Sequence, residues 1–181
     1  MLETARLLLR PWTVDDAEDL FVLASDPEIG PRAGWPVHQS LEESRNIIET
    51  VFAQSGTYAL VDKVSGKPVG AIGLMIGGAS KLTTSDKEAE LGYWLGRDYW
   101  GQGLVPEAIR ELLCYAFETL GLETIWCGYF EGNEQSKRVQ VKCGFTYHHK
   151  LENVECALIG EVRTEHVTCL TRTSWLESKE K

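Results

Sequence analysis

The most informative segment of this chain is Trp100-Gly101-Gln102-Gly103-Leu104-Val105-Pro106-Glu107. It joins a predicted strand to the first turn of a predicted helix, and its two glycines let the backbone turn tightly and approach a ligand. The first amides of a helix have no partner within it, and the helix dipole favours negative charge there. The segment therefore predicts a phosphate or pyrophosphate site, although a plain glycine turn before a helix has the same pattern.

Two common nucleotide-binding loops do not fit this segment. A P-loop needs Lys and then Ser or Thr after its last glycine, whereas leucine and valine follow Gly103. A dinucleotide-binding turn needs a third glycine, which is missing here. Pro106 suits the first helical turn, because its missing N–H costs nothing there.

The residues around this segment predict a mixed α/β fold. After it, apolar residues recur at helical spacing over residues 105–120, and Gly121 stands where a C-terminal cap belongs. Before it, residues 88–95 alternate with a period of two, which predicts a strand. Another strand is expected at residues 124–130, and a right-handed crossover would make the two strands parallel neighbours.

The rest of the chain adds further elements to this unit. Helix starts are predicted at Thr13 and at Ser40, where Glu43 completes a capping box. No long linker is present, so we expect one domain over residues 1–181. Further strands are expected at residues 7–12, 58–61, 68–76, 145–151 and 163–173, and a short helix at residues 133–144.

Composition excludes several classes of protein. Apolar residues make up 43% and charged residues 25%, as in soluble globular proteins, and no apolar run approaches the ~20 residues of a membrane span. Without a signal-peptide pattern either, we expect a cytoplasmic protein with no membrane role. A net charge of −9 argues against nucleic-acid binding and would favour a cationic partner, although solubility alone would explain it. Five dispersed cysteines without a C-x-x-C pair suit neither disulfides nor zinc, so no metal is expected.

Several motifs follow one another along the chain: Thr4-Ala5-Arg6-Leu7-Leu8-Leu9-Arg10-Pro11-Trp12, Glu90-Leu91-Gly92-Tyr93-Trp94-Leu95, Tyr99-Trp100-Gly101-Gln102-Gly103, Asn133-Glu134-Gln135-Ser136, Cys143-Gly144-Phe145 and His166-Val167-Thr168-Cys169-Leu170-Thr171-Arg172. In order and spacing they resemble the GNAT superfamily of N-acetyltransferases, in particular its RimJ/RimL-like branch. The resemblance covers nearly the whole chain. It implies a central, mostly antiparallel sheet of about seven strands with one splayed parallel pair and helices on both faces.

The resemblance also implies acetyl-CoA as the donor and gives it a place. The pantetheine arm would lie between the two splayed strands and pair with the backbone of Tyr93, Trp94 and Leu95. Lys142, with Lys137 and Arg138, would steady the adenosine phosphates, unless these side chains only form a solvated helix face. The diphosphate would bind the amides of Trp100, Gly101, Gln102, Gly103, Leu104 and Val105. The family usually has Arg or Gln where Trp100 stands and Gly or Ala where Val105 stands, and we expect amide binding to survive both changes.

Glu90 is the candidate general base. Acetyl transfer needs a neutral amine, yet an alkyl amine has a pKa near ~10.4 and a chain-terminal amine near ~8. A carboxylate in the cleft could take the proton directly or through a water. Glu90 lies on the strand that would line the thioester, although a glutamate on a half-exposed strand can also simply face solvent. Glu88, on the same face, is the reserve base and a candidate for acceptor binding.

The resemblance carries over three further roles. Ser136 of the Asn-x-x-Ser pattern would be the acid for the leaving thiolate, and Asn133 would contact the pantetheine. Asn133 is also a suitable helix N-cap, which would leave Ser136 in the first turn with no chemical role. A backbone N–H near residues 93–95 would meet the oxyanion. Trp35 and His38, in the loop after the first helix, are candidates for the acceptor mouth.

The predicted function is an acetyl-CoA-dependent N-acetyltransferase that moves the acetyl group directly to a primary amine in a ternary complex. By analogy with the RimJ/RimL-like branch, the acceptor is a protein or peptide amino terminus, and small amines and polyamines stay open. A domain that senses acyl-CoA without turnover is a second class of function, and another nucleotide-binding protein is a third. The sequence does not decide between a monomer and a homodimer.

Overall fold

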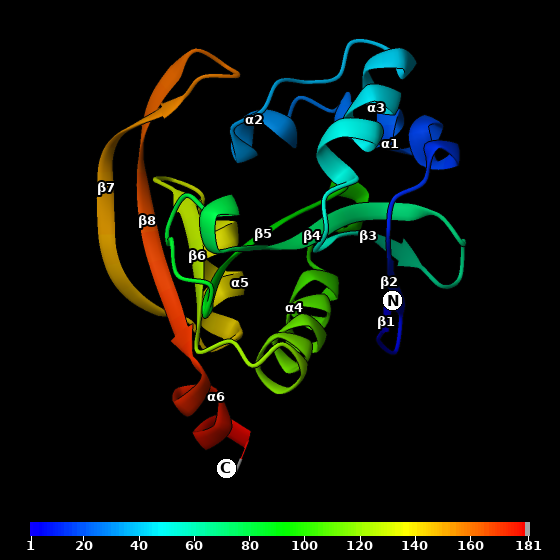
Figure 1. Cartoon of the computed structure of the whole chain (residues 1–181). Helices are drawn as coiled ribbons and strands as arrows, with labels where there is room; N and C mark the ends of the chain where they lie inside the picture. The colour runs from blue at the N-terminus through cyan, green and yellow to red at the C-terminus, as the bar shows by residue number, and fades with distance from the viewer. Residues whose placement is uncertain (180–181) are drawn as a thin grey trace.

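The chain folds around one sheet of eight strands, as the computed structural model of residues 1–179 shows (Figure 1). The strand order is β1-β2-β3-β4-β5-β6-β8-β7, and neighbours are antiparallel except for the parallel pair β5 and β6. The strands are β1 (Leu2–Glu3), β2 (Leu7–Arg10), β3 (Thr57–Asp62), β4 (Pro68–Ile76), β5 (Glu88–Leu95), β6 (Thr124–Phe130), β7 (Thr146–Cys156) and β8 (Glu161–Thr171). The expected mixed sheet with one parallel pair is confirmed, and β1 is an additional strand.

Helices cover both faces of the sheet (Figure 1). On one face lie α1 (Ala17–Ala24), α2 (Gly30–Ala33) and α3 (Leu41–Ile47), and on the other lie α4 (Leu104–Cys114) and α5 (Glu134–Lys142). The chain continues from β8 into α6 (Arg172–Lys179), which our sequence prediction had partly assigned to the last strand. π-helical turns extend α3 over Ile48–Phe52 and α4 over Tyr115–Thr119, and 3-10 turns occupy Val14–Asp16, Gly77–Ala79 and Arg97–Tyr99. Within residues 1–179, no helix is both long and apolar enough to cross a membrane.

The predicted helix starts are confirmed by their caps. Ser40 Oγ accepts a hydrogen bond from the Glu43 amide at 3.1 Å, which satisfies one of the free donors at the start of α3. The Glu43 carboxylate reaches back to the amide of Gln39 at 2.6 Å, one residue before the cap. At Thr13, the other predicted helix start, the backbone N–H and Oγ1 donate to the Asp16 carboxylate at 2.9 Å and 3.1 Å.

The main core lies between the sheet and α4. The apolar stripe of α4 is fully buried there, and it packs against buried residues of β2, β4, β5 and β6. A second cluster on the other face joins the sheet to α1 and to the π-helical turn after α3. The larger cluster fixes the start of α4 against the end of β5, which is where the predicted phosphate loop lies.

The parallel pair separates partway along its length. β5 and β6 pair only from Glu88 with Thr124 to Leu91 with Cys127. Beyond this point residues 92–95 keep their pairing with β4, and residues 128–130 keep theirs with β8. The predicted splay is confirmed, and it leaves one side of the end of β5 without a strand partner.

Candidate active site

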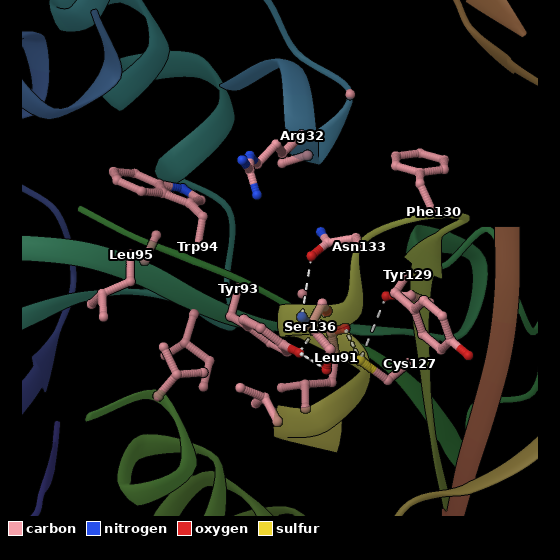
Figure 2. Close-up of a pocket in the computed structure, with 18 of the residues that line it drawn as sticks. Arg32, Leu91, Tyr93, Trp94, Leu95, Cys127, Tyr129, Phe130, Asn133 and Ser136 are labelled. Carbon is pink, nitrogen blue, oxygen red and sulfur yellow. Dashed lines mark hydrogen bonds between the residues drawn. The ribbon is translucent and has the colours of Figure 1, made fainter. Parts of the chain in front are cut away.

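A cavity of about 1070 Å³ opens where β5 and β6 separate (Figure 2). Its walls come from β5, β6, α2, the start of α4, α5 and the β7–β8 hairpin. Most of the predicted site residues line it: Trp35, Glu90, Tyr93, Trp94, Leu95, Trp100, Gly101, Gly103, Leu104, Val105, Asn133, Ser136 and Lys142. The structure leaves Gln102, Glu88 and His38 outside the lining.

The glycine loop has the geometry of an anion site. Gly101 and Gly103 have φ of 74° and 75°, in the left-handed region that favours glycine, and Gly103 caps α4. No hydrogen bond within residues 1–179 uses the backbone N–H of residues 101–105. These amides are therefore available to a diphosphate, and no side chain of the loop covers them at the glycines.

Trp100 differs from its predicted role. Its amide donates to Arg97 O at 3.1 Å, so it is not one of the free amides. The indole Nε1 donates to Leu95 O at 2.8 Å, which ties the loop to the end of β5. The guanidinium of Arg32 lies over the indole, 5.4 Å from the ring centroid. Trp100 thus contributes its side chain to the cavity wall and joins the loop to α2.

Hydrogen bonds from the amino-terminal segment fix the position of the glycine loop. Arg6 Nη1 donates to Gln102 O at 2.9 Å, and Arg6 Nε donates to Glu107 at 2.7 Å. Thr4 Oγ1 donates to the same carboxylate at 2.6 Å. Burial alone would raise the pKa of Glu107, but the hydrogen bonds from Thr4 and Arg6 outweigh it and lower the pKa. Glu107 therefore links the loop to the turn between β1 and β2.

Glu90 lies at the cavity with its orientation fixed. Its carboxylate accepts hydrogen bonds from Ser80 Oγ at 2.9 Å and from the Lys81 amide at 2.8 Å. The predicted role of Glu88 is corrected, because this residue does not line the cavity. Its carboxylate accepts hydrogen bonds from Trp126 Nε1 at 2.7 Å and from Thr83 Oγ1 at 2.6 Å. These bonds hold Glu88 at the closed part of the strand pair, away from the cavity. The structure thus separates the two candidate bases.

The hydroxyl of Ser136 meets a second hydroxyl at the foot of the cavity. Ser136 Oγ lies 2.8 Å from Tyr93 Oη (Figure 2). Gln140 Nε2 lies 3.3 Å from the same Oγ. Burial raises the pKa of Tyr93, so its hydroxyl stays protonated. Asn133 caps α5 by accepting the Ser136 amide at 3.1 Å, as the alternative interpretation expected. The cap orients Ser136. It is compatible with Ser136 as the acid for the thiolate and with Ser136 as a first-turn residue without a chemical role.

Comparison with known proteins identifies the family. Residues 6–146, most of the chain, match the family model described as the acetyltransferase (GNAT) domain. The chain belongs to the GNAT acetyltransferase family. It is 31% identical over 150 residues to the uncharacterized N-acetyltransferase YoaA of Bacillus subtilis (strain 168), covering 80% of this chain and 82% of YoaA. It is 26% identical over 125 residues to the ribosomal-protein-serine acetyltransferase of Escherichia coli (strain K12), covering 67% of each chain.

The GNAT fold is also shared with solved structures. The GNAT-family acetyltransferase from Bacillus anthracis has a TM-score of 0.82 at 20% identity, covering 95% of this chain and 98% of that chain. This likeness shows the fold, and the family match makes the chain an N-acetyltransferase with acetyl-CoA as its donor. In the part of the chain that the structure describes, no three His, Cys, Asp or Glu side chains are grouped to hold a metal ion.

Another part of the cavity wall is built by α2 and the β7–β8 hairpin. The tip of the hairpin reaches over toward α2 (Figure 1), and Arg163 Nη1 donates to Pro31 O at 2.6 Å. The Arg163 guanidinium also lies 5.1 Å from the centroid of the Phe130 ring. Trp35 lines this side and packs edge-on to Trp94, with 5.7 Å between ring centroids.

His38 does not line the cavity, which corrects its predicted place at the acceptor mouth. It is buried, and its Nδ1 lies 2.8 Å from Ser44 Oγ of α3. Burial lowers its pKa, with Glu43 acting in the opposite direction, so the ring is held neutral within the fold. Its contacts support a role in fixing the segment after α2. Of the two residues predicted at the acceptor mouth, Trp35 lines the cavity and His38 does not.

Sequence reasoning missed several charged residues of the cavity, among them Arg32 and Glu165. Arg32 belongs to the four-residue α2, which is too short for a periodic pattern and begins with Gly and Pro. Glu165 lies on β8, where the period of two places it on the face of the apolar Val167. A glutamate continuing an apolar face was a usable signal, because such a carboxylate needs a reason to be there.

Proposed function

We propose that this acetyltransferase moves the acetyl group directly from acetyl-CoA to the amino terminus of a protein or peptide. One observation carries the proposal: a gap between two splayed strands, with free amides at one end and the Glu90 carboxylate beside it. The amides of residues 101–105 would bind the diphosphate. The unpaired side of β5 beyond Leu91 would take the pantetheine as an extra strand.

The chemistry follows from the groups around the gap. Glu90 would accept a proton from the acceptor nitrogen, which attacks the thioester carbonyl carbon. A backbone N–H of residues 93–95 would donate to the oxyanion, since this side of β5 has no strand partner. As the C–S bond breaks, the hydroxyl pair of Ser136 and Tyr93 would return a proton to the thiolate.

Direct transfer is favoured over an acyl-enzyme. Cys127 is the cysteine that lines the cavity near the point of splay, and burial raises its pKa well above the usual range, with further contributions from Glu90 and Glu165. A thiol that stays protonated is a poor nucleophile. The Cys127 thiol instead donates to Leu91 O at 3.3 Å. These properties argue against Cys127 as an acyl carrier.

The acceptor class is supported by charge and by one relative. The cavity carries the carboxylates of Glu28, Glu90, Glu155 and Glu165 against fewer cations on its acceptor side, Arg32 and Lys81. An excess of negative charge attracts a protonated amine. The Escherichia coli relative is named as an acetyltransferase of a ribosomal protein, which favours a protein amino terminus among the possible amines.

An acceptor screen tests this proposal. Purified protein and acetyl-CoA are incubated with peptides that differ at the first residue, with the same peptides blocked at the amino terminus, and with polyamines. We expect thiol release and a product heavier by one acetyl group only for peptides with a free amino terminus. Acetylation of blocked peptides at lysine, or of polyamines alone, would refute the proposed acceptor. If no acceptor is acetylated while acetyl-CoA still binds, the sensing function is favoured.

A further inference from the structure

Glu165 faces the same side of the sheet as Glu90. On β6, Trp126, Gly128 and Phe130 alternate onto one face. Glu90 is in register with Trp126 on one side of β6, and Glu165 is in register with Phe130 on the other. Both glutamates line the cavity. The two strands that flank β6 thus each supply a carboxylate to the same face.

The space between these carboxylates exists because residue 128 is glycine. A Cβ built at Gly128 would collide with Glu165 Oε1, so the carboxylate lies directly over the backbone of β6. Gly128 itself lines the cavity, between Cys127 and Tyr129, which Figure 2 labels. The close approach directs Glu165 inward, over the strand that forms one wall of the gap.

The two carboxylates differ in their partners. Glu90 accepts hydrogen bonds from Ser80 and Lys81, whereas no residue from 1 to 179 donates one to the Glu165 carboxylate. Burial and the nearby Glu90 raise the pKa of Glu165, and Lys81 opposes this to a smaller degree. Glu165 therefore has free oxygens and a higher proton affinity than an ordinary glutamate.

We propose that Glu165 is a second catalytic carboxylate, which binds the protonated acceptor amine and takes the first of the two protons that its nitrogen must lose. The inference rests on the proposed function. An ammonium group enters between the two carboxylates, and one N–H bond breaks with its electron pair kept by nitrogen, leaving Glu165 protonated. The neutral amine then forms the C–N bond to the thioester carbon.

The second proton leaves the nitrogen after the C–N bond has formed and goes to Glu90. The C–S bond breaks, and the thiolate sulfur takes a proton from the hydroxyl pair of Ser136 and Tyr93, which Glu90 resupplies through water. Glu165 releases its proton to solvent. The protonated amine and acetyl-CoA thus give the amide, free thiol and one proton. Each carboxylate thus accepts one of the two protons that the acceptor nitrogen loses. The negative charge of both carboxylates would also favour binding of a cationic acceptor.

Glu165→Gln tests the inference, because it keeps the side-chain volume and removes the proton acceptor. At pH 7 we expect kcat/KM for a peptide amine to fall about tenfold to a hundredfold, with the dissociation constant of acetyl-CoA unchanged within about twofold. The deficit should shrink as pH rises above the amine's pKa of ~8, since the amine then arrives neutral. Glu165→Asp should recover part of the activity. Glu123→Gln, an exposed and equal change of charge outside the cavity, is the control.

The pH profile separates a catalytic role from a structural one. A Glu165→Gln enzyme as active as wild type, or one with the same deficit at every pH, would overturn the inference while the proposed function stands. Wild-type protein that acetylates no amine would overturn both. If Glu165→Gln fails to bind acetyl-CoA, Glu165→Asp decides: a deficit that does not depend on pH in that variant refutes the inference.

Discussion

The part of the cavity proposed to bind the donor (the donor half) and the part proposed to bind the acceptor (the acceptor half) are built in different ways. The donor half is a continuous piece of chain, in which backbone amides at residues 101–105 follow directly on β5 and its turn. The acceptor half is assembled from side chains that are far apart in sequence, among them Arg32, Glu90 and Glu165. A site made of main-chain groups tolerates changes of side chain but not of backbone conformation. A site made of side chains has the opposite sensitivity, and this contrast can be tested position by position.

The largest effect is expected in the donor half, from Gly103→Glu. The backbone at residue 103 has a positive φ, and the new carboxylate would lie where a diphosphate is expected. Strain and charge repulsion should together weaken acetyl-CoA binding about a hundredfold or more. Titration calorimetry with acetyl-CoA measures the change.

Gly121→Glu is the matched control for this change. Gly121 also has a positive φ, of 67°, and an added Cβ there would meet open space, while at Gly103 it would make only an ordinary contact, 3.7 Å from Arg6 Nη2. The two variants should lose similar stability, while only Gly103→Glu loses the ligand. Equal binding by Gly103→Glu and wild type would show that the loop is not the diphosphate site.

The next largest effect is expected at Glu90, and it falls on the acceptor half alone. Glu90→Gln should lower kcat about a hundredfold, with acetyl-CoA binding unchanged within about threefold, because a positioned base contributes 10²–10⁴-fold. Glu88→Gln changes the same charge two residues away, on a carboxylate held by Trp126 and Thr83. It should keep activity within about threefold. The reverse ranking would make Glu88, the reserve candidate, the base.

The same contrast explains what sequence reasoning could predict. The loop at residues 100–107 and the strands on each side depend on local signals: glycines, helical spacing and a period of two. Ser40 and Asn133 were readable as caps for the same reason, since a cap acts on amides two or three residues away. The parallel pairing followed from a general rule of handedness.

Other features depend on contacts that no local pattern encodes. The segment Gly30–Ala33 forms α2 because Trp35 and Arg163 hold it, and the latter contact spans 132 residues. His38 looked available in a loop, yet the fold buries it against Ser44. Glu165 reaches the cavity only because β8 pairs with β6 at a glycine. The acceptor half was therefore predicted less well than the donor half.

A smaller effect is expected from the hydroxyl pair, which lies between the two halves. Tyr93→Phe and Ser136→Ala should each lower kcat about threefold to tenfold, because the thiolate, with a pKa near ~8.5, can also take a proton from water. The two hydroxyls contact each other at 2.8 Å, so the double variant should lose less than the product of the two single losses. Steady-state kinetics on the three variants measures this coupling. Fully multiplicative losses would mean that the hydroxyls act separately.

The smallest effect is expected from Glu107→Gln, which loosens the donor loop without touching its amides. The exposed pair of Glu107 with Arg6 contributes about 0–1 kcal/mol, so we expect a modest fall in Tm and a rise of about twofold to fivefold in KM for acetyl-CoA. Because the folded pKa of Glu107 is lowered, its contribution to stability is present above the unfolded value of ~4.3 and is lost as pH falls through the folded pKa. The Tm values of wild type and Glu107→Gln should therefore converge in acid and differ most near neutral pH. A gap in Tm that persists in acid would assign the effect of this residue to packing, and the loop would then owe its position to the core beneath α4.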